Sequence, residues 1–474
     1  MKVLTIKYIF SFVFSFCFLS VFSQKELKNK IVDFGTLLPI ESASIYIQNT
    51  TVGTVSNADG KFVLVVPETF KKDTLIISSI GYKSFKIPVD EFDNSEEIYL
   101  EEDIASLDEV VLVAENRPET GNDIVLRAIE RLPRNMPDSA YIEKGFLRHK
   151  ERNKKEFKWL IESAITLYDS SYQSNSGENL KINVDQVRKS YDLRDVDSLL
   201  TYTAYLQQKT NKKNLRAKNL DRDTIQTASL VKAIKWNDNR VNGLENLFRG
   251  KLNLLRNSAN AQALFGEHIL DAHQFDLDTI LVDNGRKIYK IRISGSTDFV
   301  NLETKGIYND GYTAKGWLYI YYDNYAIKKI EYELVAASEA QKNRSKALFD
   351  TQVNHKLVMT YMEYKDKMYP KYIYYETPKL VNVGYKPIKP GDVDTSTNHK
   401  DERYYYTVQE VLFTEIILDP KKVHEELNKP WDSDIFSIKP YNKDFWKNYN
   451  TLLESDEDEQ LIQDLTKRSS LYKD

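Results

Sequence analysis

The chain between residues 28 and 102 alternates apolar and polar residues in short runs. The runs are SASIYIQ, GTVSN, KFVLVV, DTLIISS, KSFKIPV and EEIYLEE. Alternation places the apolar side chains on one face of a β-strand, and short strands at this spacing are typical of a small antiparallel sandwich. The turn at residues 57–60 ends in Asp59-Gly60, a pair that supplies the positive φ of a tight hairpin.

One of these strands is interrupted. In DTLIISSIGYKSFKIPV, residues 73–89, the alternation stops at Gly81-Tyr82 and resumes at Phe85. We expect Gly81 to supply a bend or a bulge, and Tyr82 to offer an aromatic body with a polar tip.

Two later segments show helical spacing. In TGNDIVLRAIERLP, residues 120–133, the apolar residues share one helical face, Thr120 and Asp123 can form a capping box, and Pro133 is expected to end the helix. Residues 239–265 carry leucines at helical intervals and predict a second helical region.

The remainder consists of long, aromatic-rich strands joined by predicted hairpin turns. The turns are expected at Asp283-Asn284-Gly285, near Asp323-Asn324 and at Lys365-Asp366-Lys367. The fold class is therefore mainly β with some α: an N-terminal sandwich is followed by an α+β domain built on a large antiparallel sheet, with helices against part of one face. The expected divisions are a signal segment (1–23), the sandwich (24–102), a linker (103–120), the β-rich α+β domain (121–418) and a polar C-terminal tail (419–474).

The first 23 residues, MKVLTIKYIFSFVFSFCFLSVFS, indicate export. Lys2 and Lys7 accompany an apolar run, as in a secretory signal peptide, although the ending VFS only partly fits the cleavage rule and leaves a retained anchor open. The only cysteine of the 474-residue chain, Cys17, lies inside this segment, so the exported part has neither a disulfide nor a thiolate metal site. No later apolar stretch is as long as a membrane span, and the exported chain is expected to be soluble or peripherally attached.

Composition and charge narrow the function further. The chain has 41% hydrophobic and 29% charged residues, as globular proteins do, and a formal net charge of −4. Because nucleic-acid binding requires a clustered basic surface, we expect no nucleic-acid partner.

The N-terminal region resembles a known family. Pro39, Gly53-Thr54, Asp59-Gly60-x-Phe62 and Ser79-Ile80-Gly81-Tyr82 are similar to the pattern of the carboxypeptidase regulatory-like domain. The resemblance implies a prealbumin-like sandwich of the kind found at the front of TonB-dependent receptors and other envelope proteins of Gram-negative bacteria, and therefore a location in the periplasm or at the outer membrane. The following LDEVVLV is similar to the strand that commonly comes next in those proteins.

The rest of the chain resembles carboxypeptidase-like regulatory domain-containing proteins of the envelope. The similar segments are DIVLRAIERLPRNMP, YIEKGFLRHKERNKKEFKWLIESAITLYDSSY, GWLYIYYDNYAIKKIEYEL and KPYNKDFWKNYNTLLE. Receptors with this first domain continue into a plug and a long barrel, and we expect this chain, with fewer strands, not to be the transporter. The regulatory domain itself carries no catalysis in the family.

We expect no catalytic residue, no metal site and no cofactor. A zinc peptidase needs clustered nitrogen and carboxylate ligands, and only His399-x-x-Glu402, with His424 further on, has a suggestive spacing. His268 and His273 lie five residues apart, a spacing that puts two side chains on the same face of neither a helix nor a strand. The chain also has neither a Gly-x-Ser-x-Gly elbow nor a phosphate-binding glycine loop.

Aromatic strands supply the candidate ligand-binding residues. Trp317, Tyr319 and Tyr321 share one face of a strand, and Tyr372 and Tyr374 share a face of another. These side chains are either core residues of a sheet covered on both faces or the lining of a concave face that stacks on sugars or holds an acyl chain.

The predicted function is a non-catalytic exported envelope protein with a binding or scaffolding role. Its partner would be an envelope protein, which could add a strand to the exposed sandwich edges, or a glycan or lipid ligand. One alternative is a carrier of a lipid or another hydrophobic ligand; a second, less favoured, is a hydrolase of the zinc peptidase type.

Overall fold

The computed structural model describes residues 24–103, 120–152, 157–191, 198–210, 214–249, 268–297, 312–339, 354–382, 402–437, 439–455 and 459–466, without residues 173 and 175–178 and with a few isolated residues between these ranges. These residues form mostly β-strands, with helices packed against them. The predicted fold class, mainly β with some α, is therefore confirmed.

Seven strands form the N-terminal sandwich, in two sheets with the orders β4-β1-β7 and β3-β2-β5-β6. Their bounds are β1 (Lys25–Asp33), β2 (Ser44–Ile47), β3 (Gly53–Val55), β4 (Lys61–Val66), β5 (Thr74–Ser78), β6 (Phe85–Pro88) and β7 (Ile98–Leu100). The alternation predicted from the sequence is seen directly in β4, where Phe62, Leu64 and Val66 are buried and their neighbours are half-buried. The predicted turn before β4 has Gly60 at φ +73°.

Ten strands form one antiparallel sheet in the order β10-β9-β8-β17-β16-β15-β14-β13-β12-β11. Their bounds are β8 (Tyr141–Arg152), β9 (Phe157–Asp169), β10 (Leu180–Tyr191), β11 (His273–Asp283), β12 (Arg286–Ser296), β13 (Tyr312–Tyr321), β14 (Ile327–Ala336), β15 (Asn354–Tyr364), β16 (Lys367–Asn382) and β17 (Glu402–Ile417). The three predicted turns join β11 to β12, β13 to β14 and β15 to β16. Asn284, Gly285, Lys365 and Asp366 all have positive φ, as expected for two-residue hairpin turns.

Half of the described helices, α4 to α7, lie in the sequence between β10 and β11, the two edge strands of this sheet. Their bounds are α2 (Gly121–Asn135), α4 (Ser198–Thr210), α5 (Thr227–Asn242), α6 (Leu244–Arg249), α7 (Ile269–Ala272), α9 (Pro420–Leu427), α10 (Lys443–Lys447) and α11 (Glu459–Thr466). Within the described ranges, no helix has both the length and the apolar character needed to cross a membrane.

Two helix predictions needed adjustment. The capping box of Thr120 and Asp123 begins α2, but the helix continues through Pro133 to Asn135, because a proline near the end of a helix leaves only the last turn short of a hydrogen bond. The second helical region begins earlier than expected, at Thr227, and Gly243 separates α5 from α6 with an extended backbone.

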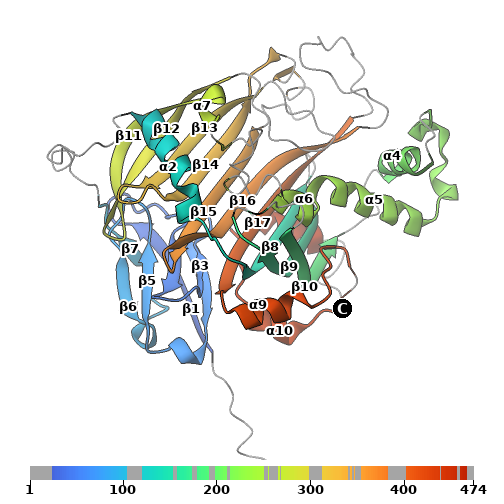
Figure 1. Cartoon of the computed structure of the whole chain (residues 1–474). Coiled ribbons are helices and arrows are strands. Elements are labelled where there is room, and N and C mark those ends of the chain that lie inside the picture. Colours follow the sequence, from blue (N-terminus) through green and yellow to red (C-terminus); the bar gives the residue numbers. More distant parts are fainter. Residues whose placement is uncertain are drawn as a thin grey trace, which may run out of the picture.

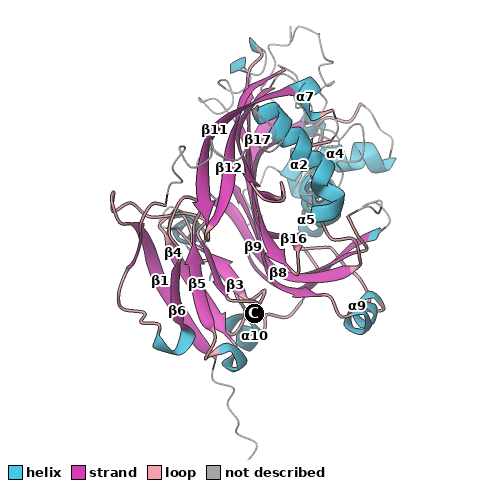
Figure 2. Ribbon diagram, turned by 60° about the vertical axis from the view of Figure 1, so that its left-hand side comes forward, coloured by secondary structure: helices cyan, strands magenta, loops and turns pink. Residues whose placement is uncertain are grey.

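The molecule has layers on both sides of the large sheet. Figure 2 shows α2, α5 and α7 on one side and the sandwich strands on the other. The chain leaves the sheet at β10 and re-enters it at the opposite edge with β11, and α5 and α7, which come between them, lie on one face. The apolar residues of that face pack against Ile124, Val125 and Ala128 of α2 in the main core.

A backbone hydrogen bond joins the sandwich to the large sheet. At the interruption of its strand, the Gly81 amide donates to the carbonyl of Val282 at 2.8 Å, and the Asp103 amide donates to the Gly81 carbonyl at 2.7 Å. Gly81 has φ +87°, which confirms the expected bend. Figure 1 shows the blue sandwich strands beside the lower ends of β11 to β15.

Candidate binding groove

Three adjoining clefts follow the line where the sandwich meets the large sheet. Their volumes are about 550, 490 and 180 Å³. The smallest cleft shares Ser44, Ser78 and Asp283 with the largest one, and it shares Glu41 and Ser42 with the third. We call this continuous surface the junction groove.

The three aromatic residues of β13 that the sequence singled out all face the junction groove, one in each cleft. Trp317 lines the 490 Å³ cleft, Tyr319 the 180 Å³ cleft and Tyr321 the 550 Å³ cleft. Their spacing of two residues along the strand places them in a row. Trp317 is half-buried, whereas Tyr319 and Tyr321 are 9% and 5% exposed.

A cation lies over each of these rings. Lys290 Nζ is 4.1 Å from the centre of the Trp317 ring, and Lys329 Nζ is 5.7 Å from that of Tyr319. The Arg286 guanidinium carbon is 3.9 Å from the centre of the Tyr321 ring. The row of aromatic rings therefore carries positive charge on its face.

The junction groove is more basic than the protein as a whole. Nine lysine or arginine side chains and six aspartate or glutamate side chains line its three clefts. The whole chain, by contrast, has a net charge of −4. A local excess of positive charge on an acidic protein attracts anionic groups to the groove.

Lys371 lies at the floor of the largest cleft. It occupies a β-bulge, where Tyr361 pairs with Pro370 and Thr360 with Tyr372. Its side chain is 4% exposed, and Nζ donates to the carbonyls of Thr51 and Gly53 in the sandwich at 3.2 and 3.3 Å. Burial lowers the pKa of Lys371 to about 7, although the charge of Glu143 opposes this shift.

Phenol groups complete the largest cleft. The Tyr321 hydroxyl donates to Asp283 Oδ2 at 2.5 Å, and burial together with this carboxylate raises the pKa of Tyr321 well above its usual range. On the sandwich side, burial and the Asp283 charge raise the pKa of Tyr46 to about 12. Both phenols are therefore neutral hydrogen-bonding groups at neutral pH.

Tyr372 and Tyr374 lie outside the junction groove. Both residues belong to a separate apolar cluster with Phe146, Val55 and Trp446 of α10. Tyr372 is 6% exposed and its hydroxyl donates to Glu410 Oε1 at 3.1 Å. The C-terminal segment expected to be a polar tail thus supplies a tryptophan that covers this part of the sheet.

The comparisons with known proteins concern the sandwich. Residues 28–112 match the family model of the CarboxypepD_reg-like domain. This region is a CarboxypepD_reg-like domain. The chain is also 34% identical over 98 residues to the TonB-dependent receptor SusC of Bacteroides thetaiotaomicron. That alignment includes 20% of this chain and 9% of SusC, so the chain spans a small fraction of the receptor's length.

Among solved structures, the chain aligns with the crystal structure of LolA superfamily protein NE2245 from Nitrosomonas europaea. The alignment covers 65% of this chain and 97% of that chain, at 10% sequence identity and a TM-score of 0.21. At this TM-score the likeness supports no argument about function. The CarboxypepD_reg-like domain and the similarity to SusC indicate an envelope-associated protein.

The histidines considered from the sequence are dispersed. His399 lies outside the described residues, and the side chain of Glu402 does as well; His424 is exposed on α9. His268 is exposed beside Asp271, whereas His273 is buried and its Nε2 lies 2.7 Å from the Tyr332 hydroxyl. Burial lowers the pKa of His273, as expected for a neutral core histidine.

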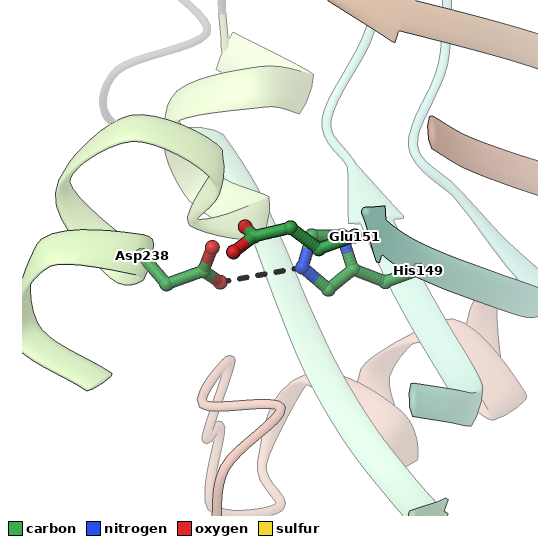
Figure 3. A group of neighbouring side chains, drawn as sticks. All are labelled: His149, Glu151 and Asp238. Atoms are coloured by element: carbon green, nitrogen blue, oxygen red, sulfur yellow. Dashed lines mark ion pairs between the residues drawn. The ribbon is translucent and has the colours of Figure 1, made fainter. Parts of the chain in front are cut away.

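The structure assembles one group of potential metal ligands that the sequence analysis missed. His149, Glu151 and Asp238 each offer a ligand atom, and these atoms lie within 4.8 Å of one another (Figure 3). His149 and Glu151 are two residues apart on β8 and so share a face, a signal that the sequence contains. Asp238 lies on α5, far along the chain from β8, and no local pattern connects it to them.

Proposed function

We propose that the protein is a non-catalytic, envelope-associated binding protein that holds an acidic glycan in the junction groove. One observation carries the proposal: a net basic groove, with a row of aromatic rings in its wall, follows the contact between the CarboxypepD_reg-like domain and the large sheet. Carboxylated sugars pair with lysine and arginine. The exposed part of the half-buried Trp317 can pack against a sugar ring.

The polar lining favours a glycan over an acyl chain at this site. Serine, threonine and asparagine side chains of the sandwich, Ser44, Thr50 and Asn49 among them, face the groove opposite β13 to β15. They offer hydroxyl and amide groups to hydroxyls of a ligand. A carrier of lipid would instead bury its ligand among mainly apolar side chains.

A location in the envelope is part of the proposal. The CarboxypepD_reg-like domain, the similarity to SusC and the signal-like first 23 residues support export to the periplasm or the outer membrane. The expected partner is then a glycan of the envelope or one that reaches it from outside.

Calorimetric titration of the purified protein with two oligosaccharides of equal length tests the proposal. We expect hexagalacturonate, which is acidic, to bind, and cellohexaose, which is neutral, to bind at least tenfold more weakly. Lys315→Glu and Lys356→Glu change exposed cations of the groove and should weaken hexagalacturonate binding without unfolding the protein. Lys72→Glu, an exposed lysine of the sandwich outside the groove, is the matched control and should bind normally.

Trp317→Ala tests whether Trp317 lines a binding groove or is only a core residue. Because Trp317 is half-buried, we expect it to lose less than about 2 kcal/mol of unfolding free energy and to bind hexagalacturonate more weakly. Trp159→Ala, in which a 2% exposed tryptophan is removed, should lose about 3 to 5 kcal/mol. Failure of both sugars to bind, or equal binding by the groove variants and the control, contradicts the proposal.

A further inference from the structure

A buried acid and histidine cluster lies on the helix side of the sheet, across from the junction groove. His149 and Glu151 of β8 point toward α5, which contributes Asp238 (Figure 3). The neighbouring Arg148 and Lys150 alternate to the other face, where they contact Glu162 and Glu410. Strand periodicity therefore separates the cluster from the positive charges next to it in the sequence.

The contact between His149 and Asp238 is unlike a hydrogen bond. His149 Nε2 lies 3.4 Å from Asp238 Oδ2, beyond the usual range for an N–H···O bond of about 2.7 to 3.2 Å. Within the described residues, neither ring nitrogen of His149 has a hydrogen-bond partner, although the side chain is 0% exposed. A buried imidazole without a hydrogen bond is costly unless another species satisfies its nitrogen.

The distance instead suits two ligands of one metal ion. Zinc binds histidine nitrogen and carboxylate oxygen at about 2.0 to 2.2 Å, so neighbouring ligands of a tetrahedral site are about 3.3 Å apart. The 3.4 Å contact has this length. Glu151 supplies a third ligand atom, a carboxylate oxygen within 4.8 Å of the other two.

The charge and burial of the two carboxylates also favour a metal ion at this position. Glu151 is 2% exposed and Asp238 is 0% exposed. Together with the His149 imidazole, the two carboxylates form a buried set of one nitrogen and two oxygen donors, which suits a divalent cation.

We propose that His149, Glu151 and Asp238 bind one divalent transition-metal ion, with zinc the best fit, and that this ion fastens α5 to β8. A nitrogen ligand with two carboxylates suits zinc, whereas magnesium and calcium prefer oxygen ligands only. Gln409 lies opposite His149 in the β8–β17 register and therefore shares its face, so its amide oxygen is a candidate fourth ligand. The burial of all three ligands makes the site structural, independent of any glycan in the groove.

Metal analysis of the full exported chain tests the site. The chain is refolded from denaturant with zinc chloride, dialysed, and its zinc content is measured by mass spectrometry. We expect about one zinc ion per chain, retention of zinc in excess magnesium, and a higher Tm with zinc than after chelation, because a ligand that binds only the folded state stabilises it. Cobalt in place of zinc should give the visible absorption of a tetrahedral site.

Matched variants assign the ligands. His149→Ala should lose the zinc ion and the rise in Tm, whereas His268→Ala, which removes an exposed histidine, should keep both. Asp238→Asn keeps the size of the side chain and should also lose zinc, while its circular dichroism spectrum stays native. This variant still tests the site if His149→Ala does not fold. No zinc uptake by the wild-type chain, or equal uptake in His149→Ala and His268→Ala, overturns the proposal.

Discussion

At the scale of single residues, a buried arginine connects the centre of the sheet to the C-terminal segment. Arg148 is 1% exposed; its Nε donates to Glu162 Oε1 at 2.9 Å and one terminal nitrogen donates to the Leu452 carbonyl at 2.6 Å. Arg188 donates to the other oxygen of Glu162 at 2.5 Å. Glu162 is 0% exposed, so its charge depends on both arginines.

Arg148→Ala should therefore be strongly destabilising. We expect a loss of about 3 to 5 kcal/mol of unfolding free energy in urea, since the variant leaves a buried carboxylate short of a partner. Arg127→Ala is the matched control: its ion pair with Glu130 is exposed, and the loss should stay below about 1 kcal/mol. Equal losses in the two variants would show that the buried pair contributes no more than a surface pair.

Lys371 predicts a pH dependence of stability. Its pKa is about 7 in the folded protein and 10.5 when unperturbed, so between these values the unfolded chain binds the proton and the folded protein does not. The free energy of unfolding attributable to Lys371 therefore rises with pH from about 7 to 10.5. Relative to Lys371→Met, the wild-type protein should gain stability between pH 7.5 and pH 9.5, measured by urea unfolding at each pH.

A control variant isolates this effect. Lys86→Met removes an exposed lysine from the rim of the same cleft and should show the pH dependence of the wild-type protein. A constant difference between Lys371→Met and the wild type across this pH range would mean that Lys371 keeps its ordinary pKa.

The sequence predicted part of the groove at this scale. Alternation alone places Trp317, Tyr319 and Tyr321 on one face of their strand. It does not tell that the sandwich lies over that face, or that α10 covers Tyr372 and Tyr374 instead. Both facts depend on contacts between segments that are far apart in the chain, for which local periodicity holds no information.

At the scale of elements, turn chemistry was the most informative signal. Asn284-Gly285 and Lys365-Asp366 lie where their hairpins turn, because the tight turns require positive φ and few residues tolerate it. The β-bulge that Lys371 occupies had no such signal. Helix ends were less well predicted, since Pro133 is tolerated in the last turn of α2.

Gly81→Ala tests the element that attaches the sandwich. A non-glycine residue at φ +87° is strained, and we expect a loss of about 1 to 2 kcal/mol of unfolding free energy. An added Cβ would lie 3.7 Å from Leu281, an ordinary contact, so the cost arises from the backbone. Gly35→Ala, at a glycine without positive φ, is the control and should be close to neutral in thermal unfolding; a similar loss there would contradict the argument.

At the scale of the whole molecule, the sandwich and the sheet share hydrogen bonds and should unfold together. Besides Gly81, the Asn57 side chain donates to the Glu454 carbonyl and the Val65 amide donates to Asn450 Oδ1. The CarboxypepD_reg-like domain is thus bonded to both the sheet and the C-terminal segment.

Scanning calorimetry should accordingly show one cooperative transition for the protein. Gly81→Ala should shift that transition to lower temperature without splitting it. Two separate transitions in the wild-type protein, with the lower one matching the isolated sandwich, would show that these hydrogen bonds do not couple the two parts.

The strand order of the large sheet could not be predicted in full from the sequence. The pattern predicts hairpins between neighbouring strands, and β8 to β10 and β11 to β17 are indeed two such series. The two series meet where β8 pairs with β17, in a register that places Ile142 opposite Ile417. Neither strand has a sequence feature that predicts this pairing.

The pairing of β8 with β17 also limits the order in which the strands of the large sheet can fold. A chain that is synthesised from its N-terminus presents β8 long before β17, so one edge of β8 stays unpaired until residues 402–417 have been made. Contacts between such distant segments form slowly, and an open strand edge readily pairs with other chains. We therefore expect the pairing of β17 with β8 to be the late, rate-limiting step of folding. The unpaired edge of β8 is the site at which an incompletely folded chain is expected to aggregate.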